Sequence, residues 1–231
     1  MKTIGFIGGM SWESSAIYYQ IANREVNARL GKSHSSRNIM VSVDFEEIAT
    51  LQHAGEWQKL THIMVEAALS LERAGAHFVV ICTNTMHLMA PEVQAAVNIP
   101  LLHIADAVGE SIKQQGIKKV GLLGTRYTME KGFYKDHLAK NYGIEVITPN
   151  DVDRADVHNI IYNELVLGKF WDASREVYQE VVRHLQTNGA EGVILGCTEI
   201  PLLIQQQHVG IPLFDTTTIH AKKAVEWSLA V

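Results

Sequence analysis

Two stretches of this chain end in side chains that could carry out proton transfer. The first is Gly75-Ala76-His77-Phe78-Val79-Val80-Ile81-Cys82-Thr83-Asn84-Thr85, and the second is Gly189-Ala190-Glu191-Gly192-Val193-Ile194-Leu195-Gly196-Cys197-Thr198-Glu199. Each is an apolar run that ends in small polar residues, as expected of a buried parallel strand with a site at its carboxyl end. Aligned by their Gly-Ala starts, the stretches place Cys197 opposite Thr83, and Gly196 opposite Cys82.

Cys197 is the group whose chemistry the sequence defines best. A free cysteine is commonly a small buried hydrophobe. Cys197, however, stands between a buried strand and the expected start of a helix at Thr198-Glu199-Ile200-Pro201. Backbone N–H groups and the helix dipole at such a position would stabilise a thiolate and a bound carboxylate. Cys82 differs, because neighbouring residues of a strand face opposite sides: if Thr83 faces the site, Cys82 faces the core.

Two further pairs of similar segments show that these stretches belong to a longer duplication. Lys2–Met10 is echoed by Lys118–Arg126, and Ile99–Leu101 by Ile211–Leu213. Periods this long indicate two related domains rather than a solenoid. Strands alternate with helices, so we expect an α/β fold of two pseudo-symmetric doubly wound domains, each with a central parallel sheet, and an active-site cleft between them. We place the first domain at residues 1–98 plus 214–231 and the second at residues 99–213.

Turn and cap residues predict where several elements begin and end. We expect a strand at 3–7, then a helix that Ser11 caps and that ends near Leu30 before Gly31. A strand at 39–43 should lead into a polar connection containing Gln52, followed by a helix from about 56 to 73. Further helices are predicted at 103–115, 131–142, 152–167, 171–188 and 217–229.

Composition argues against several classes of function. The net charge of the 231 residues is −5, which gives no basic field for a nucleic-acid partner. The longest apolar runs have the length of strands, so we expect no membrane span. The sequence shows no signal-peptide pattern, and its two cysteines both lie at strand ends. These features predict a cytoplasmic protein without disulfides.

The spacing of glycine, histidine and lysine predicts a site without a cofactor. Gly5-x-x-Gly8-Gly9 lacks the dinucleotide-binding pattern, and a turn glycine that lets the backbone approach a small ligand is the preferred interpretation. The eleven histidines include no H-E-x-x-H motif and no pair on one helix face, and there is no C-x-x-C, so no metal site is predicted. No lysine has a recognisable Schiff-base context, so pyridoxal phosphate is not suggested.

The chain resembles the aspartate/glutamate racemase family of two-lobed, cofactor-independent enzymes, and most closely its broad-specificity amino-acid racemases. Gly196-Cys197-Thr198-Glu199 is similar to the second-lobe motif, and Thr83-Asn84-Thr85 to the first-lobe Cys-Asn-Thr motif except at its cysteine. The resemblance also covers Gly8-Gly9-Met10-Ser11 and Leu123-Gly124-Thr125. It implies a racemase of L- and D-amino acids with Thr83 and Cys197 as catalytic residues. The implied binding residues are Met10, Gln52, Asn84, Thr85, Thr125, Thr128, Thr198 and Glu199.

Racemisation explains why such a site needs two acid–base groups. One group removes the α-proton from one face of the substrate, and another returns a proton to the opposite face. Asn84, Thr85, Thr198 and Glu199, with backbone amides of both motifs, would hold the α-carboxylate and spread the developing charge. Thr83 departs from the family pattern, because a thiol can be tuned to a thiolate more easily than an alcohol can be ionised. We therefore expect Cys197 to be the competent base and Thr83 a proton donor, unless Cys82 serves that face.

Substrate and partners are less closely defined. Aspartate-preferring relatives carry an Arg after the second strand and a Lys on a second-lobe helix, and here Val166 stands where the Lys would be. This absence favours a broader substrate range, with Gln52 able to bind a polar side chain. The alternatives are a single-cysteine malonate-type decarboxylase of the same superfamily and a non-catalytic two-lobed binding protein. Relatives are often homodimers, but no helix here shows a pattern assignable to an interface.

Overall fold

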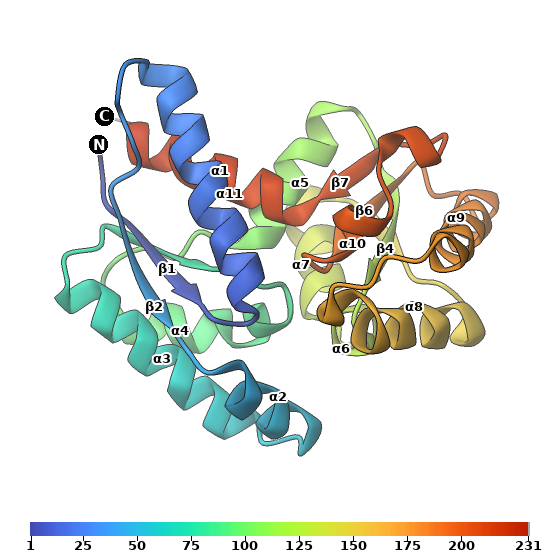
Figure 1. Ribbon diagram of the computed structural model, residues 1–231, viewed down its shortest axis with the longest axis horizontal. Coiled ribbons are helices and arrows are strands. Elements are labelled where there is room, and N and C mark those ends of the chain that lie inside the picture. Colours follow the sequence, from blue (N-terminus) through green and yellow to red (C-terminus); the bar gives the residue numbers. More distant parts are fainter. Residues whose placement is uncertain (231) are drawn as a thin grey trace. The chain divides into compact units, whose positions relative to one another are not determined.

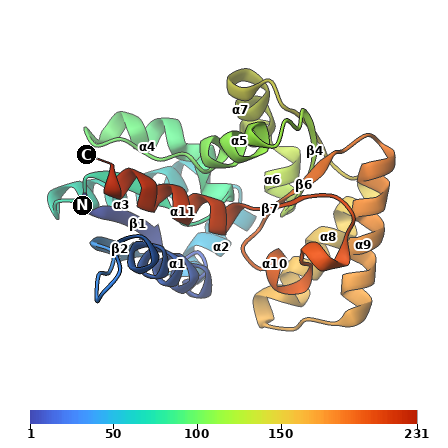
Figure 2. The ribbon, with the colours of Figure 1, turned by 90° about the horizontal axis from the view of Figure 1, so that it is seen from above.

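The computed structural model describes residues 1–230, which form two compact units (Figures 1 and 2). Unit 1 contains Met1–Ile104 and the segment that begins at Thr217, and unit 2 contains Ala105–Thr216. Each unit has its own parallel sheet with helices packed against it, so the predicted α/β class with two sheets is confirmed. No helix among the described residues is long and apolar enough to cross a membrane.

The sheet of unit 1 has three strands in the order β2-β1-β3, all parallel. The strands are β1 (Ile4–Gly8), β2 (Asn38–Ser42) and β3 (Phe78–Ile81). The helices are α1 (Trp12–Leu30), α2 (Phe45–His53), α3 (Trp57–Arg73), the 3-10 turn η1 (Thr85–Met89), α4 (Ala90–Ala96) and α11 (Thr216–Leu229). Ser11 caps α1 by accepting a hydrogen bond from the backbone N–H of Ser14, as the sequence predicts.

Alternation along β1 and β3 divides the apolar side chains of unit 1 between two faces of its sheet. Ile7, Val79 and Ile81 pack against α3 and α4. Phe6 and Cys82 belong to the opposite layer, together with α1 and α11. Figure 1 shows α1 and α3 on either side of β1 and β2. Cys82 therefore lies in the core, as strand alternation predicts.

The sheet of unit 2 has four parallel strands in the order β5-β4-β6-β7. The strands are β4 (Lys119–Gly124), β5 (Glu145–Ile147), β6 (Gly192–Gly196) and β7 (Leu213–Asp215). The helices are α5 (Ile104–Gln114), α6 (Arg126–Glu130), α7 (Phe133–Tyr142), α8 (Asp151–Asn163), η2 (Leu165–Leu167), α9 (Asp172–Thr187), α10 (Ile200–Leu203) and η3 (Gln206–His208). Leu123, Val193 and Leu195 form a core with α8 and α9.

The strand pairing of the two units repeats in the way that the duplicated segments predict. Val79 of β3 lies between β1 and an isolated bridge to Leu101. Val193 of β6 lies between β4 and Leu213 of β7. The turn glycines before β3 and β6 also have nearly the same conformation, with φ of 90° at Gly75 and 91° at Gly189. The two units are thus built on one strand arrangement, and Val79 and Val193 are equivalent positions in it.

Two details differ from the sequence expectations. The units divide at 104/105 and 216/217, a few residues later than 98/99 and 213/214, because Leu101 bonds to β3 and β7 pairs with β6. The expected polar connection around Gln52 is wrong, since helix α2 fills it. Asp44 caps α2 by accepting a hydrogen bond from the backbone N–H of Glu46 at 3.0 Å. That capping aspartate was a usable signal.

Candidate active site

The residues best suited to acid–base chemistry in unit 2 lie at the carboxyl end of its sheet. Gly124 of β4 pairs with Gly196 of β6. Thr125 and Cys197, the next residues, therefore begin the segments that follow two adjacent strands. Glycine is required at this pair, because a Cβ on Gly196 would lie 2.9 Å from the carbonyl oxygen of Leu123. The close approach of the two strands thus brings the loops after β4 and β6 together.

The thiol of Cys197 donates a hydrogen bond to the carboxylate of Glu199, with 3.0 Å between Sγ and Oε2. Thr198 donates to the same oxygen from its hydroxyl at 2.7 Å. Burial of the thiol and the negative charge of Glu199 raise the pKa of Cys197 well above its usual value. The backbone N–H groups of Thr198 and Glu199 act in the opposite direction but are outweighed.

The prediction that the surroundings of Cys197 stabilise a thiolate is therefore wrong for the substrate-free site. Helix α10 begins only at Ile200 and is four residues long, so it offers little dipole to the sulfur. The group that contacts Cys197 is an acceptor, so the favoured form of this free site is a thiol. The carboxylate of Glu199 accepts the hydrogen bonds of both Cys197 and Thr198. Its geometry suits a proton acceptor for Cys197 or a partner for a substrate ammonium group.

Thr125 and Thr128 form the loop after β4. The hydroxyl of Thr125 caps the short α6 by accepting from the backbone N–H of Thr128 at 3.4 Å. The two hydroxyls lie 3.3 Å apart, and Thr128 is fully buried. Thr128 thus supports Thr125, which is itself 9% exposed. The backbone N–H of Arg126 donates to Nδ1 of His158 at 3.2 Å and ties this loop to α8.

In unit 1 the equivalent place is occupied by Thr83. Thr83 follows Val79 by four residues, as Cys197 follows Val193, so the two occupy equivalent positions of the repeated sheet. Thr83 is partly exposed, whereas Cys82 is buried and its burial raises the pKa of its thiol well above the usual value. Within unit 1, the geometry therefore favours Thr83 over Cys82 as the residue presented at the strand end.

His87 fixes the segment that carries Thr83. Its Nδ1 lies 2.8 Å from the carbonyl oxygen of Thr83, and its Nε2 lies 3.1 Å from the backbone nitrogen of Ile104. Since a carbonyl can only accept and an N–H can only donate, Nδ1 carries the proton and Nε2 is the acceptor. His87 is thus neutral and buried, and it links the loop after β3 to Ile104, where the first segment of unit 1 ends.

Three of the other expected binding residues of unit 1 follow strands of its sheet, and the fourth lies on a helix. Met10 follows β1, Asn84 and Thr85 follow β3, and Gln52 lies on α2. All four side chains are largely buried, with Gln52 only 5% exposed. Ser14 donates from its hydroxyl to the carbonyl oxygen of Cys82 at 3.1 Å, which fastens α1 to the β3 loop.

Sequence reasoning missed Tyr162, which packs with Cys197, and Arg126, whose charge acts on Tyr162. Tyr162 on α8 packs against the same core as Cys197, and burial followed by the charges of Cys197, Tyr127 and Glu199 raises its pKa to about 12. Arg126 follows Thr125 directly, and its positive charge acts on Tyr162 in the opposite sense. No periodic signal in the sequence marked either side chain.

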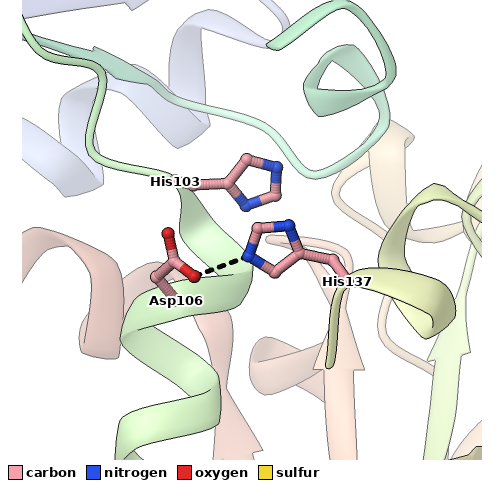
Figure 3. Close-up of side chains that lie close together, drawn as sticks. All are labelled: His103, Asp106 and His137. Atoms are coloured by element: carbon pink, nitrogen blue, oxygen red, sulfur yellow. Dashed lines mark hydrogen bonds and ion pairs between the residues drawn. The ribbon is translucent and has the colours of Figure 1, made fainter. Parts of the chain in front are cut away.

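A second cluster of titratable side chains links α5 and α7. Asp106 Oδ1 lies 2.5 Å from Nε2 of His137 (Figure 3) and accepts from the hydroxyl of Tyr142 at 3.1 Å. Burial, together with the charge of Asp106, raises the pKa of Tyr142 above its usual value. Gly109 allows this packing, since a Cβ there would lie 2.6 Å from the Tyr142 ring. The cluster belongs to the packing of α5 on α7 and lies on different elements from Cys197.

Comparison with known proteins gives the same family from three directions. Residues 7–224 match the Asp/Glu/Hydantoin racemase family. The chain is 28% identical over 180 residues to the broad specificity amino-acid racemase RacX of Bacillus subtilis, covering 72% of this chain and 71% of that protein. A solved structure from Yersinia pestis, described as a candidate Asp/Glu racemase, is 53% identical with a TM-score of 0.94, and each chain is covered completely.

A second solved structure shows the same similarity over the whole chain. This aspartate racemase homologue from Pyrococcus horikoshii is 38% identical to the chain with a TM-score of 0.87, again over the whole of both chains. The span that matches the family, residues 7–224, includes every strand of both sheets except the first residues of β1. With this coverage, the chain belongs to the Asp/Glu/Hydantoin racemase family.

Proposed function

We propose that this racemase interconverts L- and D-amino acids without a cofactor by two-base transfer of the α-proton, with Cys197 and Thr83 acting on opposite faces of the α-carbon. The observation that carries the proposal is the equivalence of Thr83 and Cys197 in the two repeated sheets. Membership of the family supports amino-acid racemisation as the reaction class. The division of labour between the two residues follows from their different acidities.

Cys197 acts as the base after its proton has passed to Glu199. The hydrogen bond between Sγ and Oε2 is already aligned for that transfer. The resulting thiolate removes the α-proton of the bound amino acid, and the C–H electron pair remains on the substrate as a carbanion conjugated with the carboxylate. Backbone N–H groups and the hydroxyl of Thr198 supply the dipoles that stabilise this charge.

Thr83 returns a proton to the other face of the planar intermediate. Its O–H bond breaks as the new C–H bond forms, and the threonine oxygen takes a proton from water in the same step, because an alkoxide is too basic to accumulate. The hydroxide left by that water takes up the proton held on Glu199, so the cycle ends with the thiol, the carboxylate and the hydroxyl restored. Abstraction from the face served by Cys197 is the easier direction. Since the two enantiomers have equal free energy, kcat/KM is equal in both directions and the asymmetry lies in kcat and KM separately.

The decisive measurement is incorporation of deuterium at the α-carbon in deuterium oxide, over all common amino acids in both enantiomers. The wild-type enzyme, treated with a chelator to remove metals and given no pyridoxal phosphate, should exchange and racemise at least one amino acid. Cys197→Ala should lose exchange altogether. Exchange that survives in this variant would remove Cys197 from the mechanism.

The same screen separates the competing functions. Carbon dioxide release from disubstituted malonates without racemisation would favour a decarboxylase, and binding without exchange would favour a binding protein. Thr83→Cys tests the first-lobe assignment, because a thiol there should bring the two directions closer in kcat. An unchanged asymmetry in Thr83→Cys would instead point to Cys82.

A further inference from the structure

We propose that His103, Asp106 and His137 bind one divalent transition-metal ion of the zinc type, which links the start of α5 to α7. The three side chains offer two imidazole nitrogens and one carboxylate oxygen, and these atoms all lie within 4.8 Å of one another (Figure 3). Among the residues that the structure describes, this is the one such group of three or more histidines, cysteines and acids. The inference goes beyond the proposed racemisation, which takes no metal ion, so either can fail without the other.

Two elements hold the three side chains. His103 directly precedes α5 and Asp106 lies in its first turn, so these two residues are three apart at the start of one helix. His137 lies on α7 and reaches Asp106 with its Nε2, as Figure 3 shows. The sequence expectation of no metal site rested on short motifs, whereas His137 follows Asp106 by 31 residues. The packing of α7 on α5 is what completes the group.

The donor atoms decide which kind of ion fits. Imidazole is a good ligand for Zn²⁺ and neighbouring transition metals, whereas Mg²⁺ and Ca²⁺ prefer sites built from oxygen. Two histidines and one carboxylate are a sufficient protein contribution for zinc, with water in the remaining position. The side chains of His137 and Asp106 are 23% and 38% exposed. Water can therefore reach the group and complete the coordination of the ion.

A small movement of the side chains is enough to seat the ion. Two ligands of one tetrahedral zinc ion lie about 3.3 Å apart, given bonds of about 2.0 Å. Oδ1 of Asp106 lies 2.5 Å from Nε2 of His137, so this pair opens by less than about 1 Å. Because an ionised carboxylate can only accept, Nε2 carries the proton in this contact. The ion takes the place of that proton, which is released to solvent or retained on Nδ1 of the same ring.

Neighbouring side chains orient two of the three ligands. The hydroxyl of Tyr142 donates to Oδ1 of Asp106 at 3.1 Å. The ring of His103 packs edge-on against the ring of His87, with 4.7 Å between the two centroids. Both ring nitrogens of His87 already have backbone partners, so His87 supports His103 and does not compete for the ion. Outer partners of this kind fix the orientation of metal ligands and strengthen metal binding.

Calorimetric titration of the chelator-treated protein, without an affinity tag, tests the site. Zn²⁺ should bind as one ion per chain and raise the thermal unfolding midpoint, and Mg²⁺ at the same concentration should do neither. His103→Ala and His137→Ala should each weaken zinc binding by more than about 100-fold. Tyr142→Phe keeps the ring but removes the hydroxyl that orients Asp106, and should weaken binding by about 10-fold. An unchanged zinc affinity in either histidine variant would overturn the inference.

His184→Ala is the matched control, because His184 also contacts an aspartate, with Nδ1 2.7 Å from Oδ2 of Asp153. Within residues 1–230 it belongs to no group of three ligands, so this variant should bind zinc as the wild type does. Cys197→Ala should likewise retain one ion per chain. Loss of the ion in Cys197→Ala would place it at the thiol and overturn the inference.

A spectroscopic measurement on the wild type keeps the inference testable where a histidine variant does not fold, which circular dichroism of the metal-free protein shows. Co²⁺ in place of Zn²⁺ should give visible absorption bands of nitrogen and oxygen coordination, and added Zn²⁺ should abolish them. A strong near-ultraviolet band from a thiolate ligand would contradict the assignment to His103, Asp106 and His137. Racemisation by the chelator-treated enzyme is a separate readout, and its failure would count against the proposed function alone.

Discussion

At the scale of single residues, two opposing effects set the acidity of Cys197. The carboxylate of Glu199 lowers its acidity, and the backbone N–H groups of Thr198 and Glu199 raise it by less. Its pKa is raised by burial and by Glu199, so the thiolate forms only toward high pH. Alkylation of Cys197 in the substrate-free enzyme should therefore increase with pH until the thiol has ionised. A site of this kind remains protonated, and so resists oxidation, until an acceptor takes the proton.

Glu199→Gln should lower the pKa of Cys197, because it removes the negative charge that disfavours the thiolate. The pH midpoint of Cys197 alkylation by iodoacetamide should move to lower pH, with mass spectrometry identifying the labelled cysteine. Exchange activity should fall at the same time, since amide oxygen is a poor proton acceptor. Thr198→Val is the matched control: it removes a hydrogen bond to Glu199 but keeps the charge, so its midpoint should not move down.

At the scale of elements, His87 couples the end of β3 to the start of α5. His87→Ala would leave the N–H of Ile104 and the carbonyl of Thr83 without this partner in a buried environment. We expect a loss of about 1–3 kcal/mol in the free energy of unfolding. Because Thr83 is then less firmly held, racemisation should decrease more than α-proton exchange at the Cys197 face.

The ratio of racemisation to exchange separates positioning from simple destabilisation. His87→Asn retains an N–H that can reach the Thr83 carbonyl and should recover part of the ratio. His62→Ala, at an exposed histidine on α3, should leave stability and ratio unchanged. If His87→Ala lowers both activities in equal proportion, His87 contributes to stability only.

The turn after β1 shows why its glycine is needed. Gly9 has φ of 90°, and a Cβ there would lie 2.1 Å from the carbonyl oxygen of Val43. The sequence suggested that a glycine in this cluster admits a ligand, whereas the backbone that approaches Gly9 is that of Val43. Gly75 has the same φ of 90° but nothing within 4 Å of an added Cβ.

Comparing Gly9→Ala with Gly75→Ala therefore isolates the contact from the backbone conformation. Both should lose about 1–3 kcal/mol for placing an L-residue in this conformation. Gly9→Ala should lose clearly more, because Val43 has to move. Equal unfolding midpoints in urea for the two variants would show that the turn accommodates a methyl group freely.

At the scale of the whole molecule, the duplication could be predicted from sequence because it is a property of buried strands. Val79 and Val193 occur in apolar runs with glycine at fixed distances, and both the parallel sheets and their equivalent pairing follow from that pattern. The contact between Cys197 and Glu199 could not be predicted, because it depends on side-chain rotamers in an irregular loop. Tyr162 carries no periodic signal either, and its packing with Cys197 depends on how α8 folds onto the sheet.

The two units should differ in their ability to fold alone. All core residues of the α8–α9 layer of unit 2 lie within the continuous segment 105–216. Unit 1 instead needs α11 from the far end of the chain, because α11 completes the layer with Tyr18 and Phe78. In addition, the hydroxyl of Ser228 donates to the carbonyl oxygen of Lys2 at 2.6 Å, and the N–H of Lys2 donates back to Ser228 at 2.7 Å.

We therefore expect segment 105–216, expressed alone, to unfold cooperatively on heating, with the dispersed amide spectrum of a packed domain. Segment 1–104 should lack cooperative unfolding, and adding 217–230 through a short flexible linker should restore it. Isolated 105–216 should keep the Glu199 effect on Cys197 alkylation, since both residues lie on the same loop. It should not racemise any amino acid, because Thr83 lies in unit 1. Racemisation by 105–216 alone would mean that a single unit supplies both proton-transfer groups, and the pairing of Thr83 with Cys197 would then be wrong.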